Sequence, residues 1–190
     1  MTETELVDIG SDAFRAIMGS LASGISVITT REDTGRPVGM TSSSLCSVSK
    51  QPPLLLFCVR PPSSTLDAIR VGGNFAVNLL DVEGRELSEL FASRNDDKFA
   101  KVSWRPSERA GMPLLEHTLA YAECAVHNLV EAGDHVIVLG RIVGGGAMAD
   151  RFPLGYWRGR YVRVFRFANH RGEELNGQSV TSNGRAPRQE

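Results

Sequence analysis

Cysteine is scarce in this sequence, with 3 residues among 190. Because Cys46, Cys58 and Cys124 are odd in number and far apart, they do not suggest a disulfide set or a zinc site. Each stands in an apolar run, so we expect three small buried side chains. The 4 histidines show neither HxH nor HExxH spacing. We therefore predict that the protein binds no metal.

Long apolar runs and an excess of basic charge are also lacking. No run approaches the roughly 20 apolar residues that span a membrane, and the acidic N-terminus, MTETELVDIG, has no signal-peptide core. The formal net charge is −1 and no basic stripe is visible, which argues against a nucleic-acid partner. Hydrophobic residues make up 42%, as in ordinary globular proteins. We predict a cytoplasmic protein without membrane or nucleic-acid contacts.

The sequence also lacks the glycine-rich fingerprint of dinucleotide-binding folds. No GxGxxG opens a helix, and the triplet at residues 144–146 follows an apolar run without helical periodicity after it. We interpret that triplet as a turn. A Rossmann nucleotide site is therefore not supported.

Short runs rich in β-branched and apolar residues dominate what is present. They predict strands at residues 24–30, 38–48, 54–59, 75–80, 119–130, 136–143 and 161–167. Short helices are expected at residues 11–21, with Ser11 or Asp12 as N-cap, at 64–69, with Ser63 or Ser64 as N-cap, and at 83–91. Strands and helices do not alternate regularly, which favours an antiparallel barrel or sandwich. The polar composition of residues 168–190 indicates a tail that cannot bury itself.

Hydroxyl groups crowd one of these predicted strands. Six of them stand among apolar residues within residues 41–49, which suggests a half-buried element. Buried hydroxyls need hydrogen-bond partners, and a phosphate or a polar ring edge would supply them. An exposed loop is the alternative. In RNDDKFA, Lys98 and Phe99 suggest either a solvated turn or a phosphate clamp.

An acid and an imidazole stand side by side in AGDHVIVLG, residues 132–140. Neighbouring strand residues point to opposite faces, so we expect Asp134 and His135 not to pair. His135 is then either simply the first residue of a strand or a residue that acts alone, on the face of Ile137 and Leu139.

Several stretches occur in a characteristic order: FRAIMGSLASGISVITT, GMTSSSLCSVSKQPPLLLFCV, FAVNLL, DKF, GMPLL, AGDH and PLGYWRGRY. In this order and spacing, over roughly residues 14–164, the chain resembles the short-chain flavin reductases of two-component flavin-dependent monooxygenases. The resemblance implies a mainly β, antiparallel, Greek-key-like split β-barrel of the FMN-binding type over residues 1–167, with a few short helices. It implies a homodimer that binds FAD or FMN and uses NADH or NADPH. Reduced flavin would diffuse to a separate monooxygenase.

The resemblance also implies site residues. Flavin contacts fall on Thr41, Ser42, Ser43, Ser44, Ser47, Val48, Ser49, Ser64, Asn78, Lys98, Phe99 and Tyr156, and His135 faces the nicotinamide as the catalytic residue. NADH is favoured because no clear arginine cluster serves a 2′-phosphate, although Arg158, Arg160 and Arg163 leave NADPH open. Two alternatives remain: a flavin-binding module without turnover, and an oxidase resembling the pyridoxine-phosphate oxidases.

Overall fold

The computed structural model describes residues 8–95 and 97–165, so the predicted tail at 168–190 lies outside the described residues. This described part contains three α-helices and one 3₁₀ turn: α1 Ser11–Met18, α2 Ser64–Gly72, α3 Arg85–Ala92 and η1 Phe99–Lys101. The strands are β1 Ser23–Gly24, β2 Ser26–Arg31, β3 Pro37–Ser42, β4 Cys46–Lys50, β5 Pro53–Val59, β6 Asn74–Leu80, β7 Trp104–Pro106, β8 Pro113–Leu115, β9 Thr118–Ala132, β10 His135–Ala147, β11 Leu154–Trp157 and β12 Arg160–Arg163.

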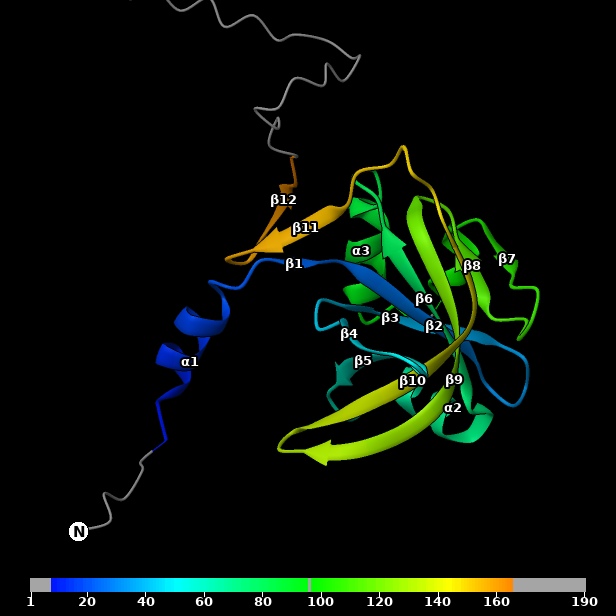
Figure 1. Cartoon of the computed structure of the whole chain (residues 1–190), viewed down its shortest axis with the longest axis horizontal. Coiled ribbons are helices and arrows are strands. Elements are labelled where there is room, and N and C mark those ends of the chain that lie inside the picture. The colour runs from blue at the N-terminus through cyan, green and yellow to red at the C-terminus, as the bar shows by residue number, and fades with distance from the viewer. Residues whose placement is uncertain (1–7, 96, 166–190) are drawn as a thin grey trace, which may run out of the picture.

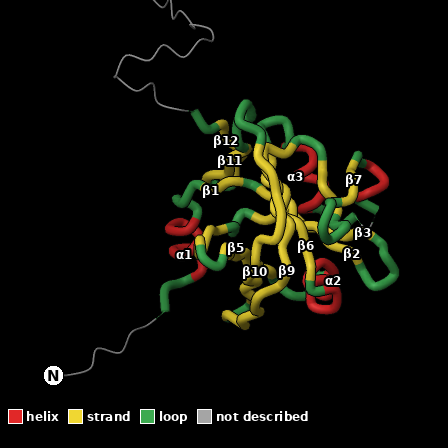
Figure 2. The backbone as a smooth tube through the Cα atoms, turned by 45° about the vertical axis from the view of Figure 1, so that its right-hand side comes forward, coloured by secondary structure: helices red, strands yellow, loops and turns green. Residues whose placement is uncertain are grey.

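One antiparallel sheet dominates the molecule, in the order β3-β2-β6-β9-β10-β5-β4. Smaller sheets are formed by β1-β11-β12 and by β7-β8, and the long β9 and β10 run through the middle of Figure 2. The prediction of a mainly β, antiparallel fold with short helices is confirmed. Each predicted strand is found, although residues 38–48 divide into β3 and β4, and the end of the run at 161–167 lies beyond the described residues.

The chain order forces the main sheet to curl. Its two edges, β3 and β4, are consecutive in sequence and joined only by residues 43–45. Such a link spans at most about 14 Å, whereas seven flat strands side by side would separate the edges by about 29 Å. The edges must therefore approach one another, which gives a barrel with a seam between β3 and β4.

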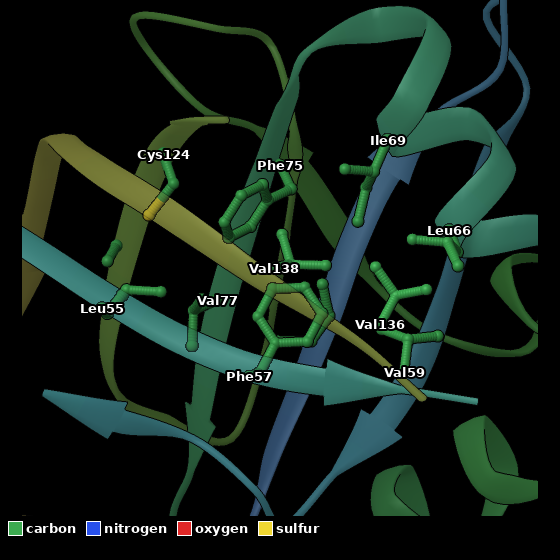
Figure 3. Close-up of a cluster of buried hydrophobic side chains, with 12 residues drawn as sticks. Leu55, Phe57, Val59, Leu66, Ile69, Phe75, Val77, Cys124, Val136 and Val138 are labelled. Carbon is green, nitrogen blue, oxygen red and sulfur yellow. The ribbon is translucent and has the colours of Figure 1, made fainter. Parts of the chain in front are cut away.

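The barrel interior is filled by alternate side chains of the central strands. In Figure 3, Phe57 of β5 and Phe75 of β6 face each other, with ring centroids 5.3 Å apart at 71°. Leu66 and Ile69 of α2 reach the same cluster and have no exposed surface. The helix begins as predicted, because the Ser63 hydroxyl accepts a hydrogen bond from the Leu66 N–H at 3.3 Å.

Glu123 on β9 is a carboxylate inside this fold, only 3% exposed. It accepts hydrogen bonds from the backbone N–H groups of Arg109 at 3.0 Å and Ala110 at 2.9 Å. Burial by itself raises the pKa of Glu123, but hydrogen bonds from Ser107 and these two N–H groups outweigh it, so the pKa lies below its usual value. The carboxylate therefore holds the loop before β8 against β9.

The glycine triplet was wrongly interpreted as a turn, because residues 144–146 continue β10 beside β9. A β-carbon on Gly145 would lie 2.6 Å from the Tyr121 carbonyl oxygen, and one on Gly144 would lie 2.9 Å from the Arg109 side chain. Glycine is needed here for close approach between neighbouring segments, and turn chemistry is not involved.

Three smaller expectations need correction. Neither Ser11 nor Asp12 caps α1: the N-cap position is Gly10, with no side-chain cap. Cys46 is exposed and Cys58 half-buried, so only Cys124 is a fully buried thiol, with a pKa that burial raises to about 12. The short strands β7, β8 and β11 were not predicted, because each consists of only three or four residues.

Helix α1 lies at the outer side of the molecule, away from α2 and α3 (Figures 1 and 2). None of its residues is buried. It is held through its C-terminal end, where the Gly19 carbonyl accepts from the Arg158 N–H at 3.1 Å and the Ser20 carbonyl accepts from the Trp157 indole at 3.2 Å. No helix among the described residues has the length and hydropathy to cross a membrane.

Candidate active site

An open cleft of about 500 Å³ lies beside β3 and the N-terminal end of α2. Ser64, Lys98 and Phe99, three of the predicted flavin contacts, line it. The remaining lining residues are Arg36, Pro37, Val38, Gly39, Met40, Pro62, Ser63, Thr65, Ser93, Arg94 and Asn95. The cleft thus combines cationic side chains with a helix N-terminus, which is an arrangement suited to an anion.

Lys98 reaches this cleft from the loop after α3. Its ammonium donates to the Phe91 carbonyl at 2.9 Å and to the Gly39 carbonyl at 3.3 Å. The first of these carbonyls belongs to the last turn of α3, where a cation is favourable. Phe99 follows with its ring edge-on to Phe91, 5.1 Å between centroids. Lys98 therefore also ties α3 to β3.

The predicted hydroxyl run forms the seam of the barrel. The Ser44 hydroxyl accepts from the Cys58 N–H of β5 at 2.9 Å and lies 3.0 Å from the Ser42 hydroxyl of β3. Ser42 is buried, Thr41, Ser44 and Ser49 are half-buried, and Ser43, Ser47 and Val48 are exposed. The expected half-buried element is present, but protein atoms already satisfy its inner hydroxyls. Its exposed members remain available to a ligand.

Asn78 lies away from any surface and has no exposed area. Its amide donates to the Val27 carbonyl at 3.2 Å and to the Thr29 hydroxyl at 3.1 Å, and its oxygen accepts from the Leu115 N–H at 2.9 Å. These contacts use both ends of the amide, and the flavin contact expected of this side chain stays a prediction. Asn78 on β6 thus connects β2 and β8 through side-chain hydrogen bonds.

The hairpin between β9 and β10 ends in a two-residue turn, since Ala132 pairs with His135. Gly133 takes the first central position with φ of 62°, as a type II′ turn requires. Because Asp134 belongs to the turn, strand alternation does not apply to it, and its Oδ1 lies 2.7 Å from His135 Nδ1. The prediction that the two residues cannot pair is therefore wrong.

His135 nevertheless stands where the strand prediction put it. It begins β10 on the half-buried face with Ile137 and Leu139, opposite the buried Val136 and Val138. Ile137 is the register partner of Cys58, whose N–H binds Ser44. The imidazole on β10 and the seam hydroxyl of Ser44 are therefore connected through the pairing of β10 with β5.

Tyr156 lies on β11, half-buried against Tyr161 of β12 at a centroid distance of 5.5 Å. The Tyr161 hydroxyl donates to the Ser88 hydroxyl at 2.9 Å, and the Ser88 carbonyl accepts from the Thr41 hydroxyl at 2.7 Å. A hydrogen-bonded path thus connects the small sheet to the start of the hydroxyl run.

Sequence reasoning missed three cations near these residues. Arg36 and Arg94 line the cleft, and Arg60 lies 3.4 Å from Asp134. Arg36 is held by Glu32 across the β2–β3 turn at 2.8 Å and 3.0 Å. The arginine in the TGRP turn and the arginine that opens RNDDKFA were available signals. Arg60 gave none, because its partner Asp134 lies in a turn far along the chain.

The sequence model of a family described as flavin reductase like domain matches residues 18–164. This chain belongs to that family. The predicted resemblance, and with it the prediction of an NAD(P)H-dependent flavin reductase, is confirmed. Among the described residues of the reductase, no group of three His, Cys, Asp or Glu side chains could hold a metal ion.

Relatives of the reductase carry names that extend this finding. It is 44% identical over 157 residues to flavin reductase (NADH) of Kitasatospora aureofaciens, covering 82% of each chain. It is 45% identical over 129 residues to flavin reductase (NADPH) of Lentzea aerocolonigenes, covering 67% of this chain and 75% of that one. It is 40% identical over 154 residues to the flavin-dependent monooxygenase reductase subunit HsaB of Mycobacterium tuberculosis, covering 80% and 81%.

Solved structures share the fold. The NADH:FAD oxidoreductase SgcE6 of Streptomyces globisporus C-1027, in complex with NAD and FAD fragments, is 33% identical with a TM-score of 0.77, covering 89% of this chain and 100% of that one. Some relatives are longer: the reductase spans about half, 47%, of a probable flavin reductase of Rhizobium meliloti (strain 1021).

Proposed function

We propose that the reductase uses NADH to reduce FAD and releases the reduced flavin to a separate monooxygenase, and that it works as a homodimer. SgcE6 is an NADH:FAD oxidoreductase, and HsaB is the reductase subunit of a flavin-dependent monooxygenase. A cytoplasmic location remains a prediction.

The observation that carries this proposal is the cationic cleft beside α2. Arg36, Arg94 and Lys98 line it together with Ser63 and Ser64 at the helix N-terminus. Charge-assisted hydrogen bonds and helix N–H groups are what a flavin phosphate or pyrophosphate requires. A volume of about 500 Å³ is within the range of cofactor pockets. The residues present therefore fit the phosphate-bearing end of a flavin.

The seam would hold the ring end of the same molecule. Met40 lines the cleft, and the hydroxyl run begins at the next residue, Thr41. The seam then continues through Ser44 to β5 and, two positions along the neighbouring strand, to His135. A flavin extended from the cleft along the seam would reach the hairpin that presents His135.

Flavin when bound accepts a hydride from the nicotinamide, so the chain itself has to bind, align and exclude water. Close stacking of the two rings is where orientation contributes most to the rate. We assign His135, whose side chain is 42% exposed, to the nicotinamide side. Ser43, Ser47, Val48 and Ser49 offer exposed or half-buried contacts for the isoalloxazine.

NADH is proposed over NADPH because no arginine cluster in the described part of the chain is committed to a 2′-phosphate. Arg158 lies over the Trp157 ring at 4.7 Å from its centroid. Arg160 and Arg163 belong to the short strand β12. A clear preference for NADPH in kcat/KM would contradict this part of the proposal, and Arg158→Ala and Arg160→Ala would then show which cation recognises the phosphate.

The homodimer is proposed from exposed apolar surface. On α1 and just after it, Phe14, Ile17, Met18 and Leu21 are each at least 47% exposed. Val130, Val143 and Met148 are exposed on or beside the β9–β10 hairpin. Apolar patches of this kind mark protein interfaces. Light scattering at micromolar concentration should report a dimer, and an active monomer would contradict it.

Oxidation of NADH followed at 340 nm, with and without added FAD, tests the activity directly. We expect turnover that depends on added flavin. The same assay with FMN and with NADPH ranks both substrates. Tightly retained flavin without NADH oxidation would instead indicate a binding module, and oxidation of pyridoxine phosphate would indicate an oxidase.

A further inference from the structure

Three side chains at the turn end of the β9–β10 hairpin form a chain of charges and hydrogen bonds. Asp134 Oδ1 lies 2.7 Å from His135 Nδ1, and Asp134 Oδ2 lies 3.4 Å from Arg60 Nε. Each carboxylate oxygen therefore faces one partner. The order is guanidinium, carboxylate, imidazole.

The fold itself brings these residues together. Arg60 follows the last residue of β5, and that residue, Val59, is the register partner of Val136 on β10. Gly133 and Asp134 make the turn that leads into His135. Two strand ends that are far apart in sequence thus supply one cluster, so it is set by the sheet register rather than by a flexible loop.

This cluster contributes little to stability, because its members are exposed. The side chains of Arg60, Asp134 and His135 are 71%, 67% and 42% exposed. Exposed ion pairs of this type contribute little to the free energy of folding. Its effect is therefore on the orientation and the proton position of the imidazole.

A neutral imidazole carries one N–H, and a carboxylate can only accept. When Asp134 Oδ1 contacts Nδ1, the proton is on Nδ1 and Nε2 presents a lone pair. Building on the proposed function, we propose that Asp134, held by Arg60, is a positioning residue that sets this tautomer. His135 Nε2 then accepts a hydrogen bond from the carboxamide N–H of the reduced nicotinamide.

The first test is Asp134→Asn, which keeps the shape of the side chain but can donate its amide N–H to Nδ1. We expect ¹⁵N NMR of histidine-labelled protein, at a pH where the imidazole is neutral, to show the His135 proton moved to Nε2. We also expect kcat/KM for NADH to fall about tenfold, mainly through KM, with flavin affinity unchanged. Asp134→Glu, which keeps a carboxylate acceptor, should retain the Nδ1–H tautomer and recover part of that loss.

The second test separates the tautomer from a purely structural role. Reduced 3-acetylpyridine adenine dinucleotide replaces the carboxamide by an acetyl group, which has no N–H. We compare the ratio of kcat/KM for NADH to kcat/KM for this analogue. This ratio should be about tenfold lower in Asp134→Asn than in wild-type protein. Comparing the same ratio between variants cancels the intrinsic difference in reactivity of the two dinucleotides. Asp67→Asn, which removes an exposed acid paired with Arg70, is the matched control and should change nothing.

The outcomes are distinct. Wild-type protein that does not oxidise NADH would overturn the proposed function, and this role with it. Active wild-type protein whose His135 tautomer is unchanged in Asp134→Asn overturns the positioning role alone. So does an inverted tautomer with unchanged discrimination between NADH and the acetyl analogue.

Discussion

Asn78 and His135 are both polar residues in or beside long strands, and the structure uses them in opposite ways. Asn78 has no exposed surface and hydrogen bonds at both ends of its amide. His135 has a bonded Nδ1 and a side chain that is 42% exposed. A polar side chain that the protein fully satisfies is part of the scaffold, whereas one left half open can serve a ligand.

The largest effect that tests this contrast is expected from Asn78→Ala. The substitution leaves the buried Leu115 N–H without its acceptor and removes the side-chain donor to the Val27 carbonyl and the Thr29 hydroxyl. We expect the free energy of unfolding to fall by about 3 kcal/mol, measured by urea denaturation. Asn128→Ala, on an exposed part of β9, is the control and should change it by less than about 0.5 kcal/mol. Loss of flavin affinity in the folded fraction would show that Asn78 belongs to the site.

Lys98→Ala tests whether one residue can both stabilise the scaffold and bind the ligand. Losing a charge-assisted bond of about 1.5–3 kcal/mol should lower flavin affinity about tenfold to a hundredfold, seen by fluorescence titration. Its bonds to the Phe91 and Gly39 carbonyls predict some loss of stability as well. Lys101→Ala, outside the cleft, is the control. An unchanged Kd for flavin would restrict Lys98 to the scaffold.

His135→Ala should act on the nicotinamide and spare the flavin. We expect kcat/KM for NADH to fall about tenfold to a hundredfold, or about 1.4–2.7 kcal/mol of transition-state stabilisation. Steady-state kinetics with both substrates varied gives the answer, with the exposed His127→Ala as control. A collapse of flavin affinity with normal NADH kinetics would place His135 on the other side of the ring.

The smallest effect on stability is expected from Glu123→Gln, which changes another buried polar residue. Since the folded-state pKa lies below the usual value of about 4.3, the carboxylate stabilises the fold fully above that value and loses this effect as pH falls through the folded pKa. We expect a loss of about 1–2 kcal/mol at pH 7 that shrinks below pH 4. Glu131→Gln, which is exposed, should show no such dependence.

Local patterns predicted most of the elements, and residue order predicted the family. The strand at residues 54–59 and the cap at Ser63 depend on neighbours in sequence, so they were found. Other contacts depend on the register between strands that are distant in sequence. They are the hydrogen bond from the Cys58 N–H to Ser44, the pairing of Arg60 with Asp134 and the hydrogen bonds of Asn78. Neither composition nor local pattern indicates which residues of two distant strands will be paired. Asp134 was misjudged for a different reason: strand alternation was extended one residue into a turn.

Helix α1 has a consequence for how the chain folds. It contains only the eight residues Ser11–Met18 and buries none of them, and isolated helices of that length are marginal in water. Within the described part of one chain, the hydrogen bonds from Arg158 and Trp157 just after its C-terminal end offset little of the entropy of ordering it. If α1 packs in the interface of the proposed homodimer, folding and association of this segment are one reaction governed by mass action. Its amide protons should exchange rapidly in dilute solution and slow down as the protein concentration rises.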